Sequence, residues 1–183
     1  MSCVDNIGKL SSMLKPLSEA HDADAAVVLL LKPVDHDLQI LIVKRAENPA
    51  DPWSGQLALP GGKRDSKDRH LKQTAVRETL EETNINLLDR CRFLGSIEPL
   101  RSTRRPEMKI LPFVVLLEAE PPIRLNEELK DFVWISLEEL VKHRGTVEFS
   151  FGEFPAYLVG NSVIWGLTYR ILERFIHIIE CLR

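Results

Sequence analysis

The chain has 183 residues, of which 44% are hydrophobic and 28% charged, the composition of a globular protein large enough for one domain with a core. Its net charge of −3 gives no support to coating nucleic acid or binding a membrane surface, so we expect neither partner. Three cysteines without CxxC spacing, no signal-peptide-like run and no membrane-length apolar stretch favour a reducing, cytoplasmic compartment without a disulfide framework.

The first half of the chain predicts a helix followed by strands. Residues 6–20 favour a helix interrupted by Pro16, within an N-terminal extension over residues 1–22. Residues 25–32 are a continuous apolar run of strand length, which is typical of burial on both faces. A second strand over residues 38–44 follows a short turn, so the two strands predict a hairpin.

A glycine turn and an acidic helix come next. The segment LALPGGKRD predicts a short strand that runs into the turn, and the helix spans about residues 70–83. Asn84 tolerates the left-handed conformation that commonly ends a helix. Val76 and Leu80 lie opposite Glu78 on a helical projection, which predicts one apolar face and one acidic face.

The second half predicts strands over residues 92–97, 110–118 and 131–135, and then a helix over residues 136–143 capped by Ser136. Residues 163–182 predict a long apolar C-terminal helix. The order of these elements favours a single α/β domain over residues 1–183, with a mixed sheet between helical layers. The apolar surface of the last helix is broader than one narrow stripe, so we expect a homodimer that buries part of it.

Three glutamates raise the question of function. Glu78, Glu81 and Glu82 fall at i, i+3 and i+4, on one face of the acidic helix, where like charges cost about 0.2–0.5 kcal/mol per pair. A solvated face partly neutralised by Arg77 is one interpretation. A metal site is the other, because the preceding PGG turn lets backbone carbonyls approach an ion, and carboxylate and carbonyl oxygens suit Mg²⁺ or Mn²⁺.

Residues 61–85, GGKRDSKDRHLKQTAVRETLEETNI, resemble the signature of the Nudix hydrolases, G-x5-E-x7-R-E-U-x-E-E-x-G-U, in which U is aliphatic. The spacing from Gly62 to Arg77 is one residue longer than the pattern. Asp68 or Arg69 takes the place of the first glutamate, Thr79 stands at an aliphatic position, and Asn84 replaces the last glycine. The resemblance implies the Nudix α/β/α sandwich and the metal-dependent attack of water on a substituted diphosphate.

The resemblance also implies roles by position. Glu78 and Glu82 match the main metal ligands, Gly62 matches the glycine beside the ion, and Glu81 matches a further ligand or a base that acts through metal-bound water. Arg77 matches the arginine that orients the glutamates by charge-assisted hydrogen bonds. Glu128 corresponds to an acidic residue that often reaches the site, although a polar turn is an equal alternative.

The segments SGQLALPGGKRDSKD and FPAYLVGNSVIWGLTYRIL resemble the coenzyme A pyrophosphatase-like branch of the family, which favours coenzyme A as substrate. Arg45 fits part of the upstream signature of that branch, whereas Ala50 stands where a further arginine is expected. ADP-ribose or another nucleoside diphosphate derivative is the alternative substrate, and a catalytically silent nucleotide-binding module is the alternative of another class.

Four further residues are candidates for binding the substrate. A loop that contains Arg101, Arg104 and Arg105 favours phosphate binding, since the guanidinium fork suits phosphate, although a solvated loop explains it equally well. For Trp53 there are two interpretations: the ring stacks on a base of the substrate, or it anchors its own loop.

Overall fold

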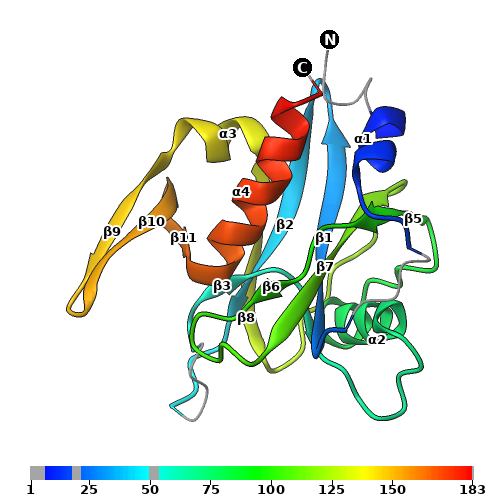
Figure 1. Ribbon diagram of the computed structural model, residues 1–183, viewed down its shortest axis with the longest axis horizontal. Coiled ribbons are helices and arrows are strands. Elements are labelled where there is room, and N and C mark those ends of the chain that lie inside the picture. The colour runs from blue at the N-terminus through cyan, green and yellow to red at the C-terminus, as the bar shows by residue number, and fades with distance from the viewer. Residues whose placement is uncertain (1–6, 18–21, 50–53, 183) are drawn as a thin grey trace.

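The hairpin of β1 (Ala25–Val34) and β2 (Asp37–Arg45), predicted from the sequence, is the centre of an eight-stranded sheet (Figure 1). The computed structural model describes residues 7–17, 22–49 and 54–182. Along its length β1 pairs with the parallel strand β7 (Lys109–Leu117), and the other strand pairs of this sheet are antiparallel. The sheet is therefore mixed, as expected.

The sheet splits where the glycine turn enters it. Residues 31–34 of β1 pair with residues 37–40 of β2, but beyond this point the two strands take different partners. Residues 25–27 of β1 pair with β4 (Gly61–Lys63), while residues 43–44 of β2 pair with β3 (Leu57–Ala58). The glycine turn thus lies between diverging strands, and the chain leaves it toward α2 (Leu71–Thr83).

Helices cover both faces of the sheet. The apolar residues of α2 pack with Val28, Leu30 and Phe113 on one face, and those of α4 (Gly166–Glu180) pack with Leu29 and Ile40 on the other. The predicted α/β/α sandwich is confirmed. The other elements are α1 (Ile7–Met13) and α3 (Leu137–Lys142), with β5 (Cys91–Ser96) and β6 (Leu100–Arg101) beside β7 and β8 (Leu129–Ser136) beside β2.

A second, three-stranded sheet was not predicted. It consists of β9 (Arg144–Phe149), β10 (Gly152–Val159) and β11 (Ser162–Trp165), and β9 and β10 extend away from the main sheet (Figure 1). The expected start of the last helix at residue 163 is wrong, because residues 162–165 pair with β10. Gly166, at φ 65°, then turns the chain into the helix.

The apolar breadth of α4 is explained within this chain. Its core-facing residues are at most 5% exposed, and they pack against the sheet, α1 and the three-stranded sheet: Ile171, Leu172, Phe175, Ile176 and Ile179. This packing removes the reason for expecting a homodimer through that helix, and dimerisation stays a prediction.

The N-terminal helix is shorter than expected. It ends at Met13, and Lys15 exchanges backbone hydrogen bonds with Ser96 instead of continuing the helix. Cys91 and Cys181 are free thiols, whereas Cys3 lies outside the described residues. None of the helices within the described ranges has the length and apolar character needed to cross a membrane.

Candidate active site

The acidic helix forms at the predicted place. The ring Nδ1 of His70 accepts a hydrogen bond from the backbone N–H of Gln73 at 3.2 Å and caps the first turn of α2. Asn84 ends the helix at φ 62°, in the left-handed conformation, and its N–H donates to the carbonyl of Leu80. These caps set the limits of the helix from which Glu78 and Glu82 contact the glycine turn.

The faces of α2 differ from the prediction. Leu80 is 43% exposed, whereas Glu82 is only 3% exposed and faces the sheet. The expectation of one apolar and one acidic face is therefore wrong. The reason is a hydrogen bond, because Oε2 of Glu82 accepts from the backbone N–H of Gly61 at 2.9 Å and so gains a partner for its carboxylate in the interior.

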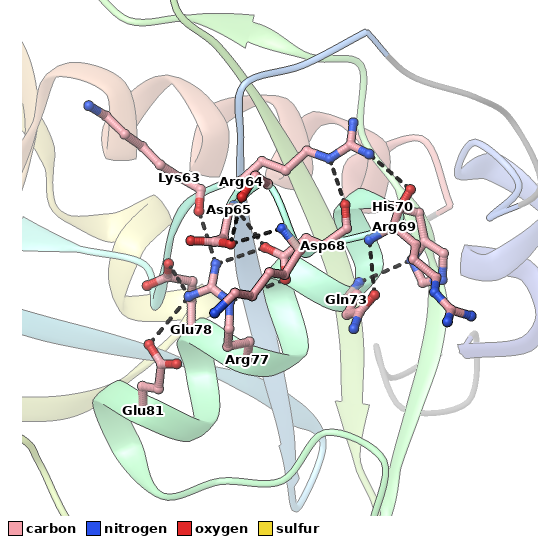
Figure 2. Close-up of polar contacts among 12 residues, drawn as sticks. Lys63, Arg64, Asp65, Asp68, Arg69, His70, Gln73, Arg77, Glu78 and Glu81 are labelled. Carbon is pink, nitrogen blue, oxygen red and sulfur yellow. Dashed lines mark hydrogen bonds and ion pairs between the residues drawn. The ribbon is translucent and has the colours of Figure 1, made fainter.

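Asp68 and Arg77 form the anchor of the site (Figure 2). The Arg77 guanidinium donates to both carboxylate oxygens of Asp68, from Nε at 3.2 Å and from Nη2 at 2.8 Å. Asp68 is buried, and the guanidinium of Arg77 beside it holds the pKa of that carboxyl well below its usual range. Of the two residues that the sequence left open, Asp68 and not Arg69 is thus the partner of the motif arginine.

The extra residue of this loop is absorbed between Asp68 and Arg77, since Asp68 keeps the five-residue spacing of the pattern from Gly62. Arg64, which sequence reasoning missed, stabilises the loop by donating to the backbone carbonyls of Asp68 at 3.1 Å and Arg69 at 2.9 Å (Figure 2). In the sequence, the one-residue lengthening between Gly62 and Arg77 was the feature that indicated a different loop structure here.

Arg77 also holds two of the glutamates. Its Nη1 donates to Glu78 at 2.7 Å and to Glu81 at 3.3 Å, while Nη2 donates to the carbonyl of Lys63 at 3.1 Å (Figure 2). These bonds tie the acidic helix to the end of β4. Because Asp68 holds the guanidinium from the other side, these contacts with Glu78 and Glu81 agree with the orienting role that the resemblance implies for Arg77, and that role stays a prediction.

The two glycines of the turn are required by close contacts. A Cβ on Gly61, which has φ 139°, would lie 2.2 Å from the backbone oxygen of Ala26. A Cβ on Gly62 would lie 2.5 Å from the carboxylate of Glu78. Gly62 itself pairs with Ala26 in the β1–β4 ladder, so this tight approach brings the carboxylate of Glu78 against the backbone of β4.

The electrostatics of the glutamates indicate a site that favours a cation. Burial, opposed in part by the Gly61 N–H, raises the pKa of Glu82 to about 7, and the neighbouring charges of Glu78 and Glu128 add to this rise. Burial also raises the pKa of Glu78, against the effect of Arg77. Positive charge among these carboxylates would reverse both shifts.

Arg45 and Glu128 join this cluster. They lie at the end of the β2–β8 pairing, where the N–H of Ala46 donates to the carbonyl of Glu128 at 2.8 Å. The charge of Arg45 lowers the pKa of Glu82, and that of Glu128 raises the pKa of Glu78 and of Glu82. The structure thus brings together Arg45 and Glu128, which lie 83 positions apart in the sequence, and the glutamates of α2 between them.

The carboxylate oxygens fit Mg²⁺ or Mn²⁺ by their chemistry, although they do not yet converge on one point. Within the described ranges, no three His, Cys, Asp or Glu side chains stand close enough to hold an ion as they are. Glu78 and Glu81 are turned toward Arg77, Glu82 is turned toward Gly61, and the side chain of Glu81 is 56% exposed. To coordinate an ion together, these glutamate side chains would have to rotate, while the backbone of α2 could stay in place.

Three of the remaining predicted residues lie on another segment of the chain. Arg101 is the last residue of β6, and Arg104 and Arg105 are exposed in the connection that follows it to β7; we call residues 101–108 the arginine loop. The Arg101 guanidinium donates to the carbonyl of Pro106 at 2.8 Å. Trp53 lies outside the described residues.

The Asp68–Arg77 pair leads to a prediction about stability. Asp68→Asn removes a buried carboxylate charge and leaves the half-buried Arg77 guanidinium without its main counter-charge. We therefore expect the free energy of unfolding at pH 7 to fall by about 3 kcal/mol in urea titrations. Because the folded-state pKa of Asp68 is depressed, the pair stabilises the protein above the unfolded pKa and its contribution disappears only in strong acid. Asp89→Asn, at an exposed position, is the control, and an equal loss in both variants would contradict the prediction.

Comparison with known proteins agrees with this geometry. A family model described as NUDIX domain matches residues 21–154. Nudix hydrolase 22, chloroplastic, of Arabidopsis thaliana is 33% identical over 165 residues, 82% of this chain and 53% of that protein, so the chain spans about half the length of this relative. Peroxisomal coenzyme A diphosphatase ndx-8 of Caenorhabditis elegans is 29% identical over 159 residues, 85% of this chain and 67% of that protein. The crystal structure of a Nudix hydrolase from M. smegmatis, RenU, shares the fold, with a TM-score of 0.62, 15% identity and coverage of 93% and 95% of the two chains.

Proposed function

Because the chain belongs to the Nudix hydrolase family, we propose that it hydrolyses the diphosphate linkage of coenzyme A or an acyl-coenzyme A. Water adds to one phosphorus and the bridging P–O bond breaks, which gives 3′,5′-ADP and a phosphopantetheine product. The observation that carries the proposal is that Glu78 and Glu82 both contact the glycine turn. The carboxylate of Glu78 lies against Gly62 and is held by Arg77, and Glu82 accepts from the N–H of Gly61.

The roles of the residues follow from their positions. Glu78 and Glu82 would hold Mg²⁺ or Mn²⁺ beside Gly62, and Glu81 reaches the same side of the helix from its exposed position. The bound ion would lower the pKa of the attacking water and offset the charge that develops on the phosphates. Glu81 and Glu128 are the two candidates for accepting the proton of that water, because both carboxylates border Glu78.

Arg77 acts through the glutamates. Its guanidinium bonds to Asp68, Glu78 and Glu81, so it sets the direction of the carboxylates that carry the chemistry. Arg45 lies beside Glu82 and Glu128, where a fixed positive charge would favour a substrate phosphate. Positioning and electrostatics of this kind supply most of the catalysis in phosphoryl transfer.

Coenzyme A as substrate is supported by the two segments that resemble the coenzyme A pyrophosphatase-like branch and by the name of the nematode relative, which is a statement about that protein. The names of the two relatives also state a peroxisomal and a chloroplast location for those proteins. The cytoplasmic location expected for this chain therefore stays a prediction.

The substrate is tested by kcat/KM for coenzyme A, dephospho-coenzyme A, ADP-ribose and NADH under one condition. We expect coenzyme A to exceed ADP-ribose and NADH by about tenfold or more, which is about 1.4 kcal/mol of transition-state stabilisation. A tenfold advantage of ADP-ribose or NADH would overturn the coenzyme A assignment but leave a Nudix hydrolase. Tight binding of one compound without any cleavage would favour the silent binding module.

A further inference from the structure

The first turns of α4 lie between two segments that come from opposite sides of the helix. Thr168 Oγ1 donates to the carbonyl of Leu57 in β3 at 3.1 Å. Arg170 Nη1 donates to the carbonyl of Arg101 at 2.9 Å and to Oγ1 of Thr103 at 3.3 Å. Residues two apart on a helix project about 200° from one another, so the start of α4 is tied to β3 through one side and to the arginine loop through another.

The arginine loop is built as an ordered unit. The N–H of Ser102 donates to the carbonyl of Met108 at 3.0 Å, and the N–H of Met108 donates to the carbonyl of Arg105 at 2.8 Å. Ser102 is buried, and its hydroxyl accepts from the N–H of Arg105 at 3.3 Å. These bonds close the loop on itself, while Arg104 and Arg105 remain exposed on it.

The strand pairing places this loop relative to the glycine turn. Lys63, Ala25, Ile110 and Leu100 are paired side by side across β4, β1, β7 and β6. Three strand spacings of about 4.8 Å put β6 about 14 Å from β4. The arginine loop and the loop that contains Asp68 leave the sheet at the same end, so one extended substrate is able to meet both.

This spacing indicates what the arginine loop recognises. A group on β6 is too far from Gly62 to share the scissile diphosphate, but an arginine side chain is long enough to span part of that distance. The fitting group is a second phosphate, attached to the same substrate at a distance from the diphosphate. Coenzyme A carries such a phosphate on its ribose, and ADP-ribose does not.

We infer that Arg170 is a positioning residue for substrate binding, which holds the arginine loop so that Arg104 and Arg105 meet a phosphate distal to the cleaved diphosphate. This inference rests on the proposed function. It assigns a role to the IWGLTYRIL segment, in which Gly166 turns the chain into α4, Thr168 fixes β3 and Arg170 fixes the loop. The two segments that point to coenzyme A in the sequence are thereby joined in space.

The first test is binding of 3′,5′-ADP and 5′-AMP by calorimetry, which needs no turnover. In Arg170→Met the apolar stem is kept and the donors are lost, so we expect about tenfold weaker binding of 3′,5′-ADP and less than about threefold change for 5′-AMP. Arg170→Lys should restore part of the affinity, because one ammonium replaces the fork. Arg174→Met, one turn along the same helix and exposed, is the control.

Kinetics and a double-mutant cycle complete the test. With coenzyme A, Arg170→Met should raise KM about tenfold and leave kcat within about threefold. Combining it with Arg104→Gln and Arg105→Gln should add little to the loss of 3′,5′-ADP affinity, because Arg170 acts through that loop. Fully additive losses, or equal losses for 3′,5′-ADP and 5′-AMP, would overturn the inference. Absence of coenzyme A cleavage by the wild type would instead overturn the proposed function, and the calorimetry would still decide the role of Arg170.

Discussion

Glu82→Gln is expected to lose at least about 100-fold in kcat/KM at saturating metal, equivalent to about 2.7 kcal/mol of transition-state stabilisation. Glutamine keeps the size of the side chain, and its carbonyl oxygen still accepts the hydrogen bond from Gly61. It removes the charge that the proposed metal site needs. The matched control is Glu153→Gln, at an exposed position of β10, which should leave activity unchanged. Activity of Glu82→Gln within a few-fold of the wild type would remove Glu82 from the metal site.

The same substitution should not destabilise the metal-free protein. Because burial raises the pKa of Glu82 from 4.5 to about 7, the folded state holds this proton more tightly than the unfolded chain does. The contribution of Glu82 to the free energy of unfolding is therefore fully present below pH 4.5, and it is lost as the pH rises through about 7. Glutamine does not ionise, so the variant does not lose this stability as the pH rises. Between pH 5 and 8 its free energy of unfolding should exceed that of the wild type by up to about 3 kcal/mol. Urea titrations across that range measure the difference, and a variant that loses stability relative to the wild type would contradict the burial of an ionisable group.

Removal of divalent ions is expected to abolish turnover. Glu78, Glu82 and Glu128 gather negative charge at the end of β4, and Arg77 is already engaged by Asp68. Without a cation, a substrate diphosphate would meet a cluster in which the carboxylates outnumber the nearby Arg77 and Arg45. Excess chelator should therefore reduce hydrolysis to background, and either Mg²⁺ or Mn²⁺ should restore it.

Two controls make the metal result specific. Ca²⁺ added in place of Mg²⁺ tests the geometry, since it takes more oxygen ligands at longer distances. Circular dichroism of the chelated protein tests the fold, which should persist because the cores on both faces of the sheet are apolar. Undiminished hydrolysis in excess chelator would refute the proposed mechanism.

The elements with a strong hydrophobic pattern were predictable from the sequence. The continuous apolar run in β1 indicated burial on both faces, and β2 and β7 followed from the same signal. The limits of α2 were predictable from Asn84 and from the loop before His70, because caps are local chemistry. The anchoring role of Arg77 followed from the motif and agrees with its contacts.

Features that depend on distant partners were not predictable. Glu82 faces the sheet because Gly61 offers an N–H, which no helical projection of α2 reveals. Residues 162–165 form β11 because they pair with β10, although in the sequence they continue the apolar pattern of α4. Asp68 became distinguishable from Arg69 only when the loop brought one of them to Arg77. In each case a tertiary contact overrides the local pattern.

The side chains that α2 and α4 bury are different in kind, so we expect the two helical layers to differ in their local stability. On this face the helix buries three threonines and a glutamate, and the described residues offer no hydrogen-bond partner to the hydroxyl of Thr79. The helix α4 buries only apolar side chains on the other side. We therefore expect the backbone amides of α2 to exchange with solvent through sub-global openings of lower free energy than those that expose α4. An ion bound by Glu78 and Glu82 would raise the free energy of those openings. Metal binding would therefore slow the hydrogen exchange of the α2 amides and leave the exchange of the α4 amides unchanged.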